Sequence, residues 1–392
     1  MRVVDRQEIS ILSEGLEQQI KDFDLRLAMR YAGYPDPAVG YPPMDNDWGL
    51  FPQAGVTRSK VYYGNQLSSY NHHHTLARFK DRFLVSWSSG LTHEDHPGQQ
   101  VRYSSSPDGL QWEADRILAA TDPDSGVVRN NAGLFASHSM LYALVGVCNT
   151  RGNRQLGMCS MEAERMRLDV YATDDLETWT HHEGVSDTVY LFEAPRLTSG
   201  GNLLCCGSAI DAWDQALVLL WEGTTDLTVE PRVVKIPKAE GLAPNQGTWY
   251  ETDDGRLWMF LRDVEFSCRL ALTVSDDGGS TWSKPRFTDF PNTCSRAYAG
   301  QLSDGRYYLA GNNYRRLLDR RSMLLALSDD GREFDRMYTV VTGDTTRRIE
   351  GKHKEDGYHY ANCLADGDNL LLAYSYNKED IDVAVIDTKS LT

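Results

Sequence analysis

Residues 275–282 read Ser275-Asp-Asp-Gly-Gly-Ser-Thr-Trp282, and this octapeptide says more about the architecture than any other segment. It predicts a tight turn between two strands. The carboxylate of Asp277 can accept hydrogen bonds from backbone N–H groups of the turn, and Gly279 can take a backbone conformation that other residues resist. Trp282 follows, where its ring can pack between adjacent strands. We therefore expect a hairpin that its own side chains hold together.

Weaker copies of the octapeptide recur along the chain, each directly after a strand-like segment. Trp282 and Phe334 are 52 residues apart, whereas Trp179 and Trp282 are 103 apart, which is about two such units. Self-similarity at a fixed period of this size indicates a repeat architecture. The copies are Ser105-Ser-Pro-Asp-Gly-Leu-Gln-Trp112, Thr173-Asp-Asp-Leu-Glu-Thr-Trp179 and Ser328-Asp-Asp-Gly-Arg-Glu-Phe334, with a decayed turn near Asp226.

Each unit also contains an inner strand, a glycine turn and a second strand upstream of the octapeptide, as in GTWYETDDGRLWMFLRD. This order of elements predicts one four-stranded blade of a β-propeller. The last blade has only three strands of its own, so TRSKVYYG at 57–64 is expected to add the fourth and to close the ring, which removes an exposed edge. Six blades are expected, with seven as the alternative, and their inner strands start near residues 74, 134, 192, 248, 297 and 359.

The segment before the propeller has a different character. Residues 7–30 carry apolar side chains at helical spacing, and residues 31–56 are rich in Pro and Gly. We therefore expect a helical and extended segment over 1–56 and one all-β domain over 57–392. The N-terminus has no apolar signal-peptide core, which predicts a cytoplasmic protein, or a secreted or periplasmic one if a leader has been removed.

The composition restricts the partners. The net charge of −16 repels the phosphates of nucleic acid and of anionic lipid, and no window approaches the length of apolar sequence that a membrane helix needs. We therefore expect no nucleic acid and no membrane partner. An anionic ligand would need a local basic pocket. The seven Cys have no framework spacing, which indicates reduced thiols.

Histidines are concentrated in one blade. Five of the ten lie within 25 residues, in Tyr70-Asn-His-His-His74 and in the loop Leu91-Thr-His-Glu-Asp-His-Pro97. Consecutive histidines are unusual in a core, because a buried neutral imidazole needs hydrogen-bond partners. Three interpretations stay open for them: a surface loop without a role, a zinc site, or catalysis.

Arginines recur on successive units and would make one end of the channel basic in an acidic protein. Guanidinium groups bind carboxylates through paired hydrogen bonds, and tyrosine rings can stack on a sugar. The residues of these two kinds that we take as candidates, with their acidic and histidine neighbours, are Arg151, Arg154, Arg196, Arg262, Arg296, Tyr250, Glu251, Tyr298, His359 and Tyr360.

The octapeptide resembles the Asp-box, S-x-D-x-G-x-T-W, and residues 57–392 resemble the sialidase (BNR-repeat) superfamily. The resemblance implies an all-β propeller of sialidase type that acts on carbohydrate. An exo-sialidase of this superfamily needs three arginines on a carboxylate, an Asp as acid and a Tyr/Glu nucleophile pair, and it usually opens its propeller with Arg-Ile-Pro. That tripeptide is absent here, which argues against hydrolysis of sialic acid.

The histidines resemble those of propeller lyases that cut beside a glucuronate, the ulvan lyases and rhamnose–glucuronate lyases. Those enzymes have a His at the start of an early inner strand and a second about twenty residues later, as His73 and His93 are here. An arginine of the next blade faces the uronate carboxylate, and Arg154 is its best match, with Arg151 as the substitute. His74 stands where these lyases have Pro, so the register among His72, His73 and His74 is open.

This resemblance implies elimination at the C4–O bond of a glucuronate residue in an oligo- or polysaccharide. A donor on the carboxylate must stabilise the enediolate that forms when the C5 proton leaves, and a neutral imidazole suits the base. His73 is the expected base, with His93 and Arg154 on the carboxylate. Tyr298 or Tyr360 could assist as acid, and the expected substrate ligands are His72, Arg151, Arg196, Glu251, Arg262, Arg296 and His359.

Two other functions stay open. A sialidase-type glycoside hydrolase would need carboxylates that face each other across the pocket, and a propeller that only binds glycans would need no catalytic group. None of the three functions requires a cofactor, although a structural calcium or zinc ion could brace the blades. The carboxylates that a hydrolase could use are Glu94, Asp95, Glu193, Glu251 and Asp263.

Overall fold

The computed structural model describes residues 51–149, 166–191, 193–210, 212, 214–265, 267–314 and 317–391. Most of the expected N-terminal segment 1–56 lies outside this described part of the chain, and so do Arg151 and Arg154. Within the described part, no helix has the length and apolar character needed to cross a membrane.

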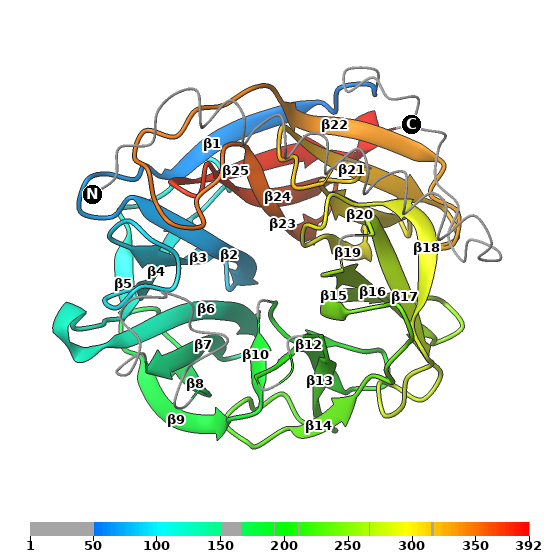
Figure 1. Cartoon of the computed structure of the whole chain (residues 1–392), viewed down its shortest axis with the longest axis horizontal. Helices are drawn as coiled ribbons and strands as arrows, with labels where there is room; N and C mark the ends of the chain where they lie inside the picture. The colour runs from blue at the N-terminus through cyan, green and yellow to red at the C-terminus, as the bar shows by residue number, and fades with distance from the viewer. Residues whose placement is uncertain are drawn as a thin grey trace. The chain divides into compact units, whose positions relative to one another are not determined.

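The described residues form six antiparallel sheets around a central channel, which confirms the predicted six-bladed propeller (Figure 1). In each sheet the first strand lies nearest the channel, except for the closing strand described below. Blade 1 contains β2 (Tyr70–Phe79), β3 (Arg82–Gly90), β4 (Gln100–Ser106) and β5 (Arg116–Ala119). Blade 2 contains β6 (Val127–Ala136), β7 (Leu141–Asn149), β8 (Met166–Thr173) and β9 (Thr180–Ser186). Blade 3 contains β10 (Val189–Leu191), β11 (Arg196–Leu197), β12 (Leu203–Ala209), β13 (Ala216–Trp221) and β14 (Arg232–Lys235).

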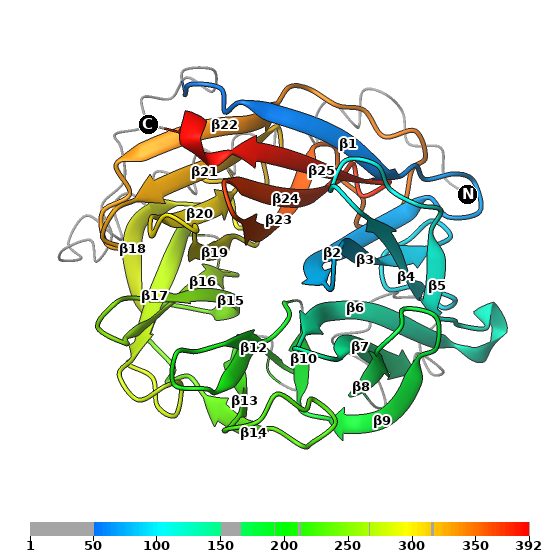
Figure 2. The same ribbon diagram turned by 180° about the vertical axis from the view of Figure 1, so that it is seen from behind.

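The other three blades follow the same plan, and Figure 2 shows them from behind. Blade 4 contains β15 (Pro244–Glu251), β16 (Leu257–Asp263), β17 (Arg269–Ser275) and β18 (Arg286–Pro291). Blade 5 contains β19 (Tyr298–Gln301), β20 (Tyr307–Gly311), β21 (Ser322–Ser328) and β22 (Arg336–Thr342). Blade 6 contains β23 (Tyr358–Asp366), β24 (Asn369–Tyr376), β25 (Asp380–Asp387) and the earlier β1 (Val56–Tyr62). Two short 3-10 helices complete the described elements, η1 (Pro123–Ser125) and η2 (Thr388–Ser390).

The N-terminal strand closes the ring, as the sequence predicts. β1 pairs antiparallel with β25, from Val56 opposite Ile386 to Tyr62 opposite Ile381, and it forms the outer side of blade 6 (Figure 1). The residues just before β1 run along blade 5, where the Ala54 backbone N–H donates to the Thr339 carbonyl at 3.0 Å.

The Asp turns form in five places. In each, the Asp carboxylate accepts a hydrogen bond from a backbone N–H group two to four residues later in the chain. Such bonds satisfy the turn locally, so the hairpin does not depend on the rest of the fold. The turns are those of Asp108, Asp175, Asp277 and Asp330, and the decayed one of Asp226.

The tryptophans that follow these turns differ in burial. Trp282 is buried between blades 3 and 4, and its indole N–H donates to the Gly279 carbonyl at 3.0 Å. Trp112 and Trp179 are half-buried, so the repeated turns do not bury their tryptophans equally. Trp112 packs at the rim of the hydrophobic cluster between blades 1 and 6, where its indole N–H donates to the hydroxyl of Ser59 on the outermost strand at 3.1 Å.

The inner strands share an irregularity that matters for function. β2, β15 and β23 each contain a β-bulge in their first half. There His73, Gln246 and Tyr360 have φ values of 52°, 47° and 51°, in the left-handed region that costs a residue with a side chain about 1–3 kcal/mol. Bulges re-aim side chains and are frequent beside active sites. Three repeat-equivalent side chains are therefore singled out at one end of the channel.

The inner strands run in the same direction through the channel. His74 hydrogen-bonds the Tyr360 carbonyl at 2.9 Å, and farther along both strands the Leu76 backbone N–H donates to Asn362 Oδ1 at 2.7 Å. The first halves of β2 and β23 therefore meet at one mouth of the channel, and their second halves meet at the other.

Candidate functional site

The bulges place a cluster of aromatic rings at the mouth formed by the first halves of the inner strands. The ring centroids of His72 and His73 are 4.6 Å apart, and those of His72 and Tyr360 are 4.5 Å apart. The His359 ring lies 5.9 Å from that of His72, in an edge-on orientation. We refer to this end of the channel as the histidine mouth, lined by His72, His73, His74, His359 and Tyr360.

The histidines of this mouth are neutral. Burial lowers the pKa of His72 and of His73, and it lowers the pKa of His74 to about 3. Nδ1 of His72 lies 2.7 Å from the hydroxyl of Ser375, whereas its Nε2 is buried with no hydrogen-bond partner among the described residues. Imidazoles that stay neutral at pH 7 can accept a proton, which is what a general base needs.

The acidic partner of His73 is Glu94, from the loop after β3. Glu94 Oε1 lies 3.4 Å from His73 Nε2 and accepts a hydrogen bond from the Tyr70 hydroxyl at 3.0 Å. The other oxygen, Oε2, lies 2.9 Å from Lys378 Nζ. Burial alone would raise the pKa of Glu94, but the Lys378 ammonium group and His73 bring the pKa below its ordinary value. Glu94 is therefore ionised at neutral pH and orients the His73 ring.

The neighbouring carboxyl group behaves in the opposite way. Burial, together with the charge of Glu94, raises the pKa of Asp95 to about 7. Asp95 Oδ1 is buried without a hydrogen-bond partner in the described part of the chain, and the backbone at Asp95 has φ 52°. Two adjacent titratable groups whose pKa values are driven apart are typical of an acid and base pair.

Guanidinium groups surround Tyr360. Nη1 of Arg262 donates to the Tyr360 hydroxyl at 3.3 Å and to Gln246 Oε1 at 3.0 Å, and the Arg296 guanidinium lies 5.1 Å from the Tyr360 ring centroid. Arg320 is a third buried guanidinium of this region, but it already has an acidic partner, because its Nε lies 4.0 Å from Glu355 Oε2. Burial lowers the pKa of Arg320, and the charges of Glu355 and Tyr360 raise it. Sequence reasoning missed Arg320, although it lies in a loop between the second and third strands of a blade, as Glu94 does.

His93 lies in the same loop as Glu94 but makes a different contact. Its Nδ1 accepts a hydrogen bond from the backbone N–H of Lys352 at 2.9 Å, and its ring is 5.5 Å from that of His96. The contact fastens the loop to the segment between β22 and β23. The side chain of this loop that reaches His73 is Glu94, a pairing that was not predicted. In the described part of the chain, the His359 side chain makes no hydrogen bond to β2. Its Nε2 lies 3.0 Å from the carbonyl oxygen of Glu355, within hydrogen-bond distance.

Glu251 does not lie at the histidine mouth, and its role as a substrate ligand stays a prediction. It stands at the end of β15, at the opposite end of the channel, where its carboxylate accepts from the Ser199 backbone N–H at 2.7 Å. Tyr250 is buried beside it and donates to the Gly331 carbonyl. Successive side chains of β15 point to opposite faces of its sheet. Glu251 and Tyr250 therefore contact the two neighbouring blades, at Ser199 and Gly331.

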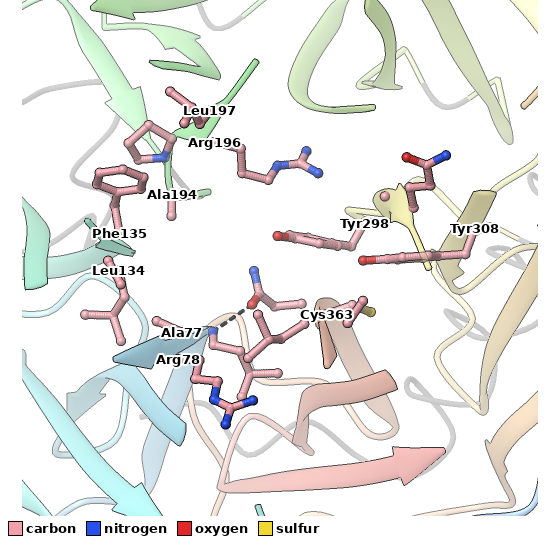
Figure 3. Close-up of a pocket in the computed structure, with 18 residues that line it drawn as sticks. Ala77, Arg78, Leu134, Phe135, Ala194, Arg196, Leu197, Tyr298, Tyr308 and Cys363 are labelled. Atoms are coloured by element: carbon pink, nitrogen blue, oxygen red, sulfur yellow. Dashed lines mark hydrogen bonds between the residues drawn. The ribbon is translucent and has the colours of Figure 1, made fainter. Parts of the chain in front are cut away.

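Arg196 and Tyr298 are also separate from the histidine mouth. They line a pocket of about 380 Å³ that is formed by the second halves of the inner strands (Figure 3). Tyr298 therefore does not lie beside His73, although it would have to do so to act as the acid in a reaction in which His73 is the base. We refer to this cavity as the lower pocket, and its aromatic and polar lining residues are Arg78, Phe135, Arg196, Tyr298, Gln301, Tyr308 and Asn362.

The remaining carboxylates proposed for a hydrolase are occupied by structural contacts. Glu193 is buried and accepts from Arg196 at 2.6 Å. Asp263 is buried and accepts hydrogen bonds from the backbone N–H groups of Ala243 and Ser267. Among the described residues, Glu94 and Asp95 are thus the carboxyl groups of that set that remain at the histidine mouth.

One group at the mouth has the spacing of metal ligands. Single ligand atoms of His72, His73 and Glu94 all lie within 4.8 Å of one another. A zinc ion takes imidazole and carboxylate ligands. In this structure Glu94 forms an ion pair with Lys378, and Nδ1 of His72 is hydrogen-bonded to Ser375. The possible structural zinc or calcium ion stays a prediction.

Comparison with known proteins adds the wider context. A model of the family described as "BNR repeat-like domain" matches residues 81–372. Among solved structures, a sialidase is 18% identical with a TM-score of 0.62, over 90% of this chain and 35% of that one. An intramolecular trans-sialidase from Ruminococcus gnavus, in complex with oseltamivir carboxylate, is 13% identical with a TM-score of 0.64, over 85% of this chain and 98% of that one. A leech intramolecular trans-sialidase is 13% identical with a TM-score of 0.67, over 88% and 71%.

The similarity to these solved structures is a similarity of fold. The chain spans about a third of the length of the first sialidase, and at these identities the shared architecture says nothing about which sugar is bound. No curated protein matches the sequence.

Proposed function

Because this chain belongs to the BNR repeat-like domain family, we propose that it is a carbohydrate-active propeller whose histidine mouth takes a sugar carboxylate. The observation that carries the proposal is the pair of guanidinium groups at Tyr360, from Arg262 and Arg296. They concentrate positive charge in a protein whose net charge is −16, and Arg is the residue best suited to bind a carboxylate. A uronate residue of an oligo- or polysaccharide offers that group.

The reaction we propose is elimination next to a glucuronate. Neutral His73 removes the proton at C5 of the sugar, and the electron pair forms the C4–C5 double bond as the C4–O bond breaks. Arg262 and Arg296 neutralise the carboxylate, so the negative charge that develops on it is stabilised. The leaving oxygen takes a proton, for which Asp95 is the donor, since its raised pKa keeps it protonated up to about pH 7.

Glu94 acts through His73 in this scheme. It stays ionised beside Lys378 and holds the ring by Nε2, so Glu94 is a positioning residue, and it stabilises the imidazolium that forms when His73 accepts the proton. The arrangement follows the general pattern of a base that is oriented by a third group.

A sialidase-type hydrolase is the second candidate, and the arginines around Tyr360 favour it. Such an enzyme needs a carboxylate that activates the tyrosine nucleophile. Here the bulge residue that shares Arg262 with Tyr360 is Gln246, an amide, which cannot take a proton from the phenol. The amide at position 246 is the reason that we prefer elimination.

One set of assays separates the candidates. The full chain is incubated with a panel of uronate-containing glycans, with ultraviolet absorbance as the measure of the unsaturated product, and in parallel with a sialoside, with release of free sialic acid as the measure. We expect an unsaturated product, and we expect the variant His73→Ala to lose it. Release of sialic acid without an unsaturated product would support the hydrolase, and glycan binding without either product would support a binding protein.

A further inference from the structure

The lower pocket offers binding chemistry that the histidine mouth does not use. Its volume of about 380 Å³ lies within the range of about 300–1,000 Å³ that is common for small-molecule sites. Figure 3 shows the side chain of Arg196 reaching into it from one wall and the rings of Tyr298 and Tyr308 from the other. It opens between the second halves of the inner strands, at the end of the channel away from His73.

The two tyrosines present donors that nothing in the described part of the chain satisfies. Tyr298 is 8% exposed and Tyr308 is 3% exposed, and neither hydroxyl has a hydrogen-bond partner among the described residues, which leaves both facing the pocket. Both hydroxyl groups are open to the pocket, and a phenol hydroxyl can donate one hydrogen bond. A ligand that supplies oxygen acceptors would therefore be favoured at this place.

The glycine at position 300 allows the hydroxyl of Tyr308 to reach the channel. Tyr308 belongs to β20, the second strand of its blade, and it pairs with Gly300 of the inner strand β19. A Cβ atom at Gly300 would lie 2.4 Å from the Tyr308 hydroxyl oxygen. The phenol can cross the inner strand because residue 300 has no side chain.

The charges in the lower pocket are balanced, in contrast with those of the histidine mouth. Arg196 is paired with Glu193 at 2.6 Å, and its guanidinium lies 5.0 Å from the Tyr298 ring centroid. Arg78 is paired with Asp366. Since each arginine of the lining has a carboxylate partner, the pocket has no excess positive charge with which to select an anion.

We infer that the lower pocket is a second carbohydrate site, which binds a single neutral sugar ring. The tyrosine rings give a face on which the apolar side of a pyranose can stack, and the two free hydroxyls donate to its oxygens. This inference rests on the lower pocket alone and does not depend on the reaction proposed for the histidine mouth.

The test is a titration of the full chain with the methyl glycosides of glucose, galactose and rhamnose, and with glucuronate as the acidic probe. Binding is measured by calorimetry and by ligand-observed NMR. We expect at least one neutral glycoside to bind. We expect the double variant Tyr298→Phe/Tyr308→Phe to weaken its affinity about twenty-five-fold, because each of the two lost hydrogen bonds weakens binding about five-fold.

Tyr307→Phe is the matched control. Tyr307 is the neighbour of Tyr308 on β20, but it packs on the other face, with its ring centroid 4.9 Å from that of Tyr250, so the variant should bind the glycoside as the parent does. Gly300→Ala should weaken binding as well, because the added methyl group would displace the Tyr308 hydroxyl from the pocket. Melting temperatures report whether each variant folds.

Four results would overturn the inference. The first is that none of the neutral glycosides binds. The second is that their affinity is the same in the double phenylalanine variant. The third is that glucuronate, and no neutral glycoside, loses affinity in that variant, which would make the pocket an anion site. Loss of neutral-sugar binding on Tyr360→Phe alone would move the site to the histidine mouth and would count against the inference as well.

Discussion

The pKa of His73 is set by two opposing influences, and their balance has a visible effect on pH dependence. Burial lowers the pKa of His73, and the neighbouring Glu94 raises it, with burial prevailing. The neutral ring is the competent base, so turnover should persist below pH 6.5, the ordinary range of a histidine, and should fall only as the pH drops through the lowered His73 pKa.

Glu94→Gln tests this balance. Removing the carboxylate removes the influence that raises the pKa of His73, so the acid limb of the pH–rate profile should move to lower pH, while the maximal rate falls because the ring is no longer held. The profile of kcat/KM against pH is the measurement, and His138→Gln, at an exposed turn, is the control. An acid limb that stays in place would separate Glu94 from the ionisation of His73.

The pKa of Asp95 determines the expected alkaline limb of the same pH–rate profile. Its pKa of about 7 means that the proton is present below about pH 7 and is lost above it, so a rate that depends on Asp95 as acid declines as the pH rises through 7. Asp95→Asn should lower kcat by about a hundred-fold or more, in the range of general acid catalysis, and should flatten the alkaline limb. A variant that keeps both kcat and the limb would show that another group, such as Tyr360, donates the proton.

The residue scale is also where prediction from sequence reached its limit. The run of histidines at 72–74 is conspicuous in the sequence, and it does lie at a mouth of the channel. The ion pair of Glu94 with Lys378 joins positions 284 apart, and no local pattern connects them. Gln246 and Tyr360 could be recognised as equivalents of His73 only after the bulges had been located, since a shift of one residue in a strand reverses the side on which each residue points.

At the scale of single elements, the Asp turns differ in what their tryptophans contribute. Trp282 is buried between blades, whereas Trp112 is half-buried at the outer edge. Trp282→Ala should therefore lower the free energy of unfolding by about 3–5 kcal/mol, as for other large core residues, and Trp112→Ala should lower it by less. Denaturant titration of both variants measures the difference. Equal losses would mean that packing between blades does not set the cost.

The turns themselves could be predicted because their chemistry is local. Asp277 and Gly279 act within eight residues of one another, so the octapeptide alone determines the hairpin. The burial of a turn's tryptophan is decided by the next blade, which no octapeptide contains. The same distinction explains why six blades could be counted from the sequence while the position of Glu251 could not be.

At the scale of the whole molecule, the ring is held by one strand that comes from far away in the sequence. Val61 of β1 is buried against blade 6. Val61 lies at the bulge of β1, between the paired residues Lys60 and Tyr62. Val61→Pro fixes φ at this point and replaces a buried side chain, which should loosen the closing strand, lower the melting temperature and expose the edge of β25 to association with other chains. Thermal unfolding with light scattering measures both effects. Val61→Ala keeps the backbone bonds and should melt closer to the parent, and equal behaviour of the two variants would contradict a closure that depends on strand pairing.

The position of β1 has a consequence for how the protein is made. β1 leaves the ribosome among the first described segments, whereas its partner β25, at residues 380–387, leaves among the last. At about 5–20 residues per second, the nascent chain spends on the order of tens of seconds as an open crescent with an unmatched strand at each tip. When β25 of one chain emerges, it can pair with the unmatched β1 of a neighbouring chain on the same messenger RNA. Crowded translation should therefore favour swapped dimers, and slower initiation should favour closed monomers.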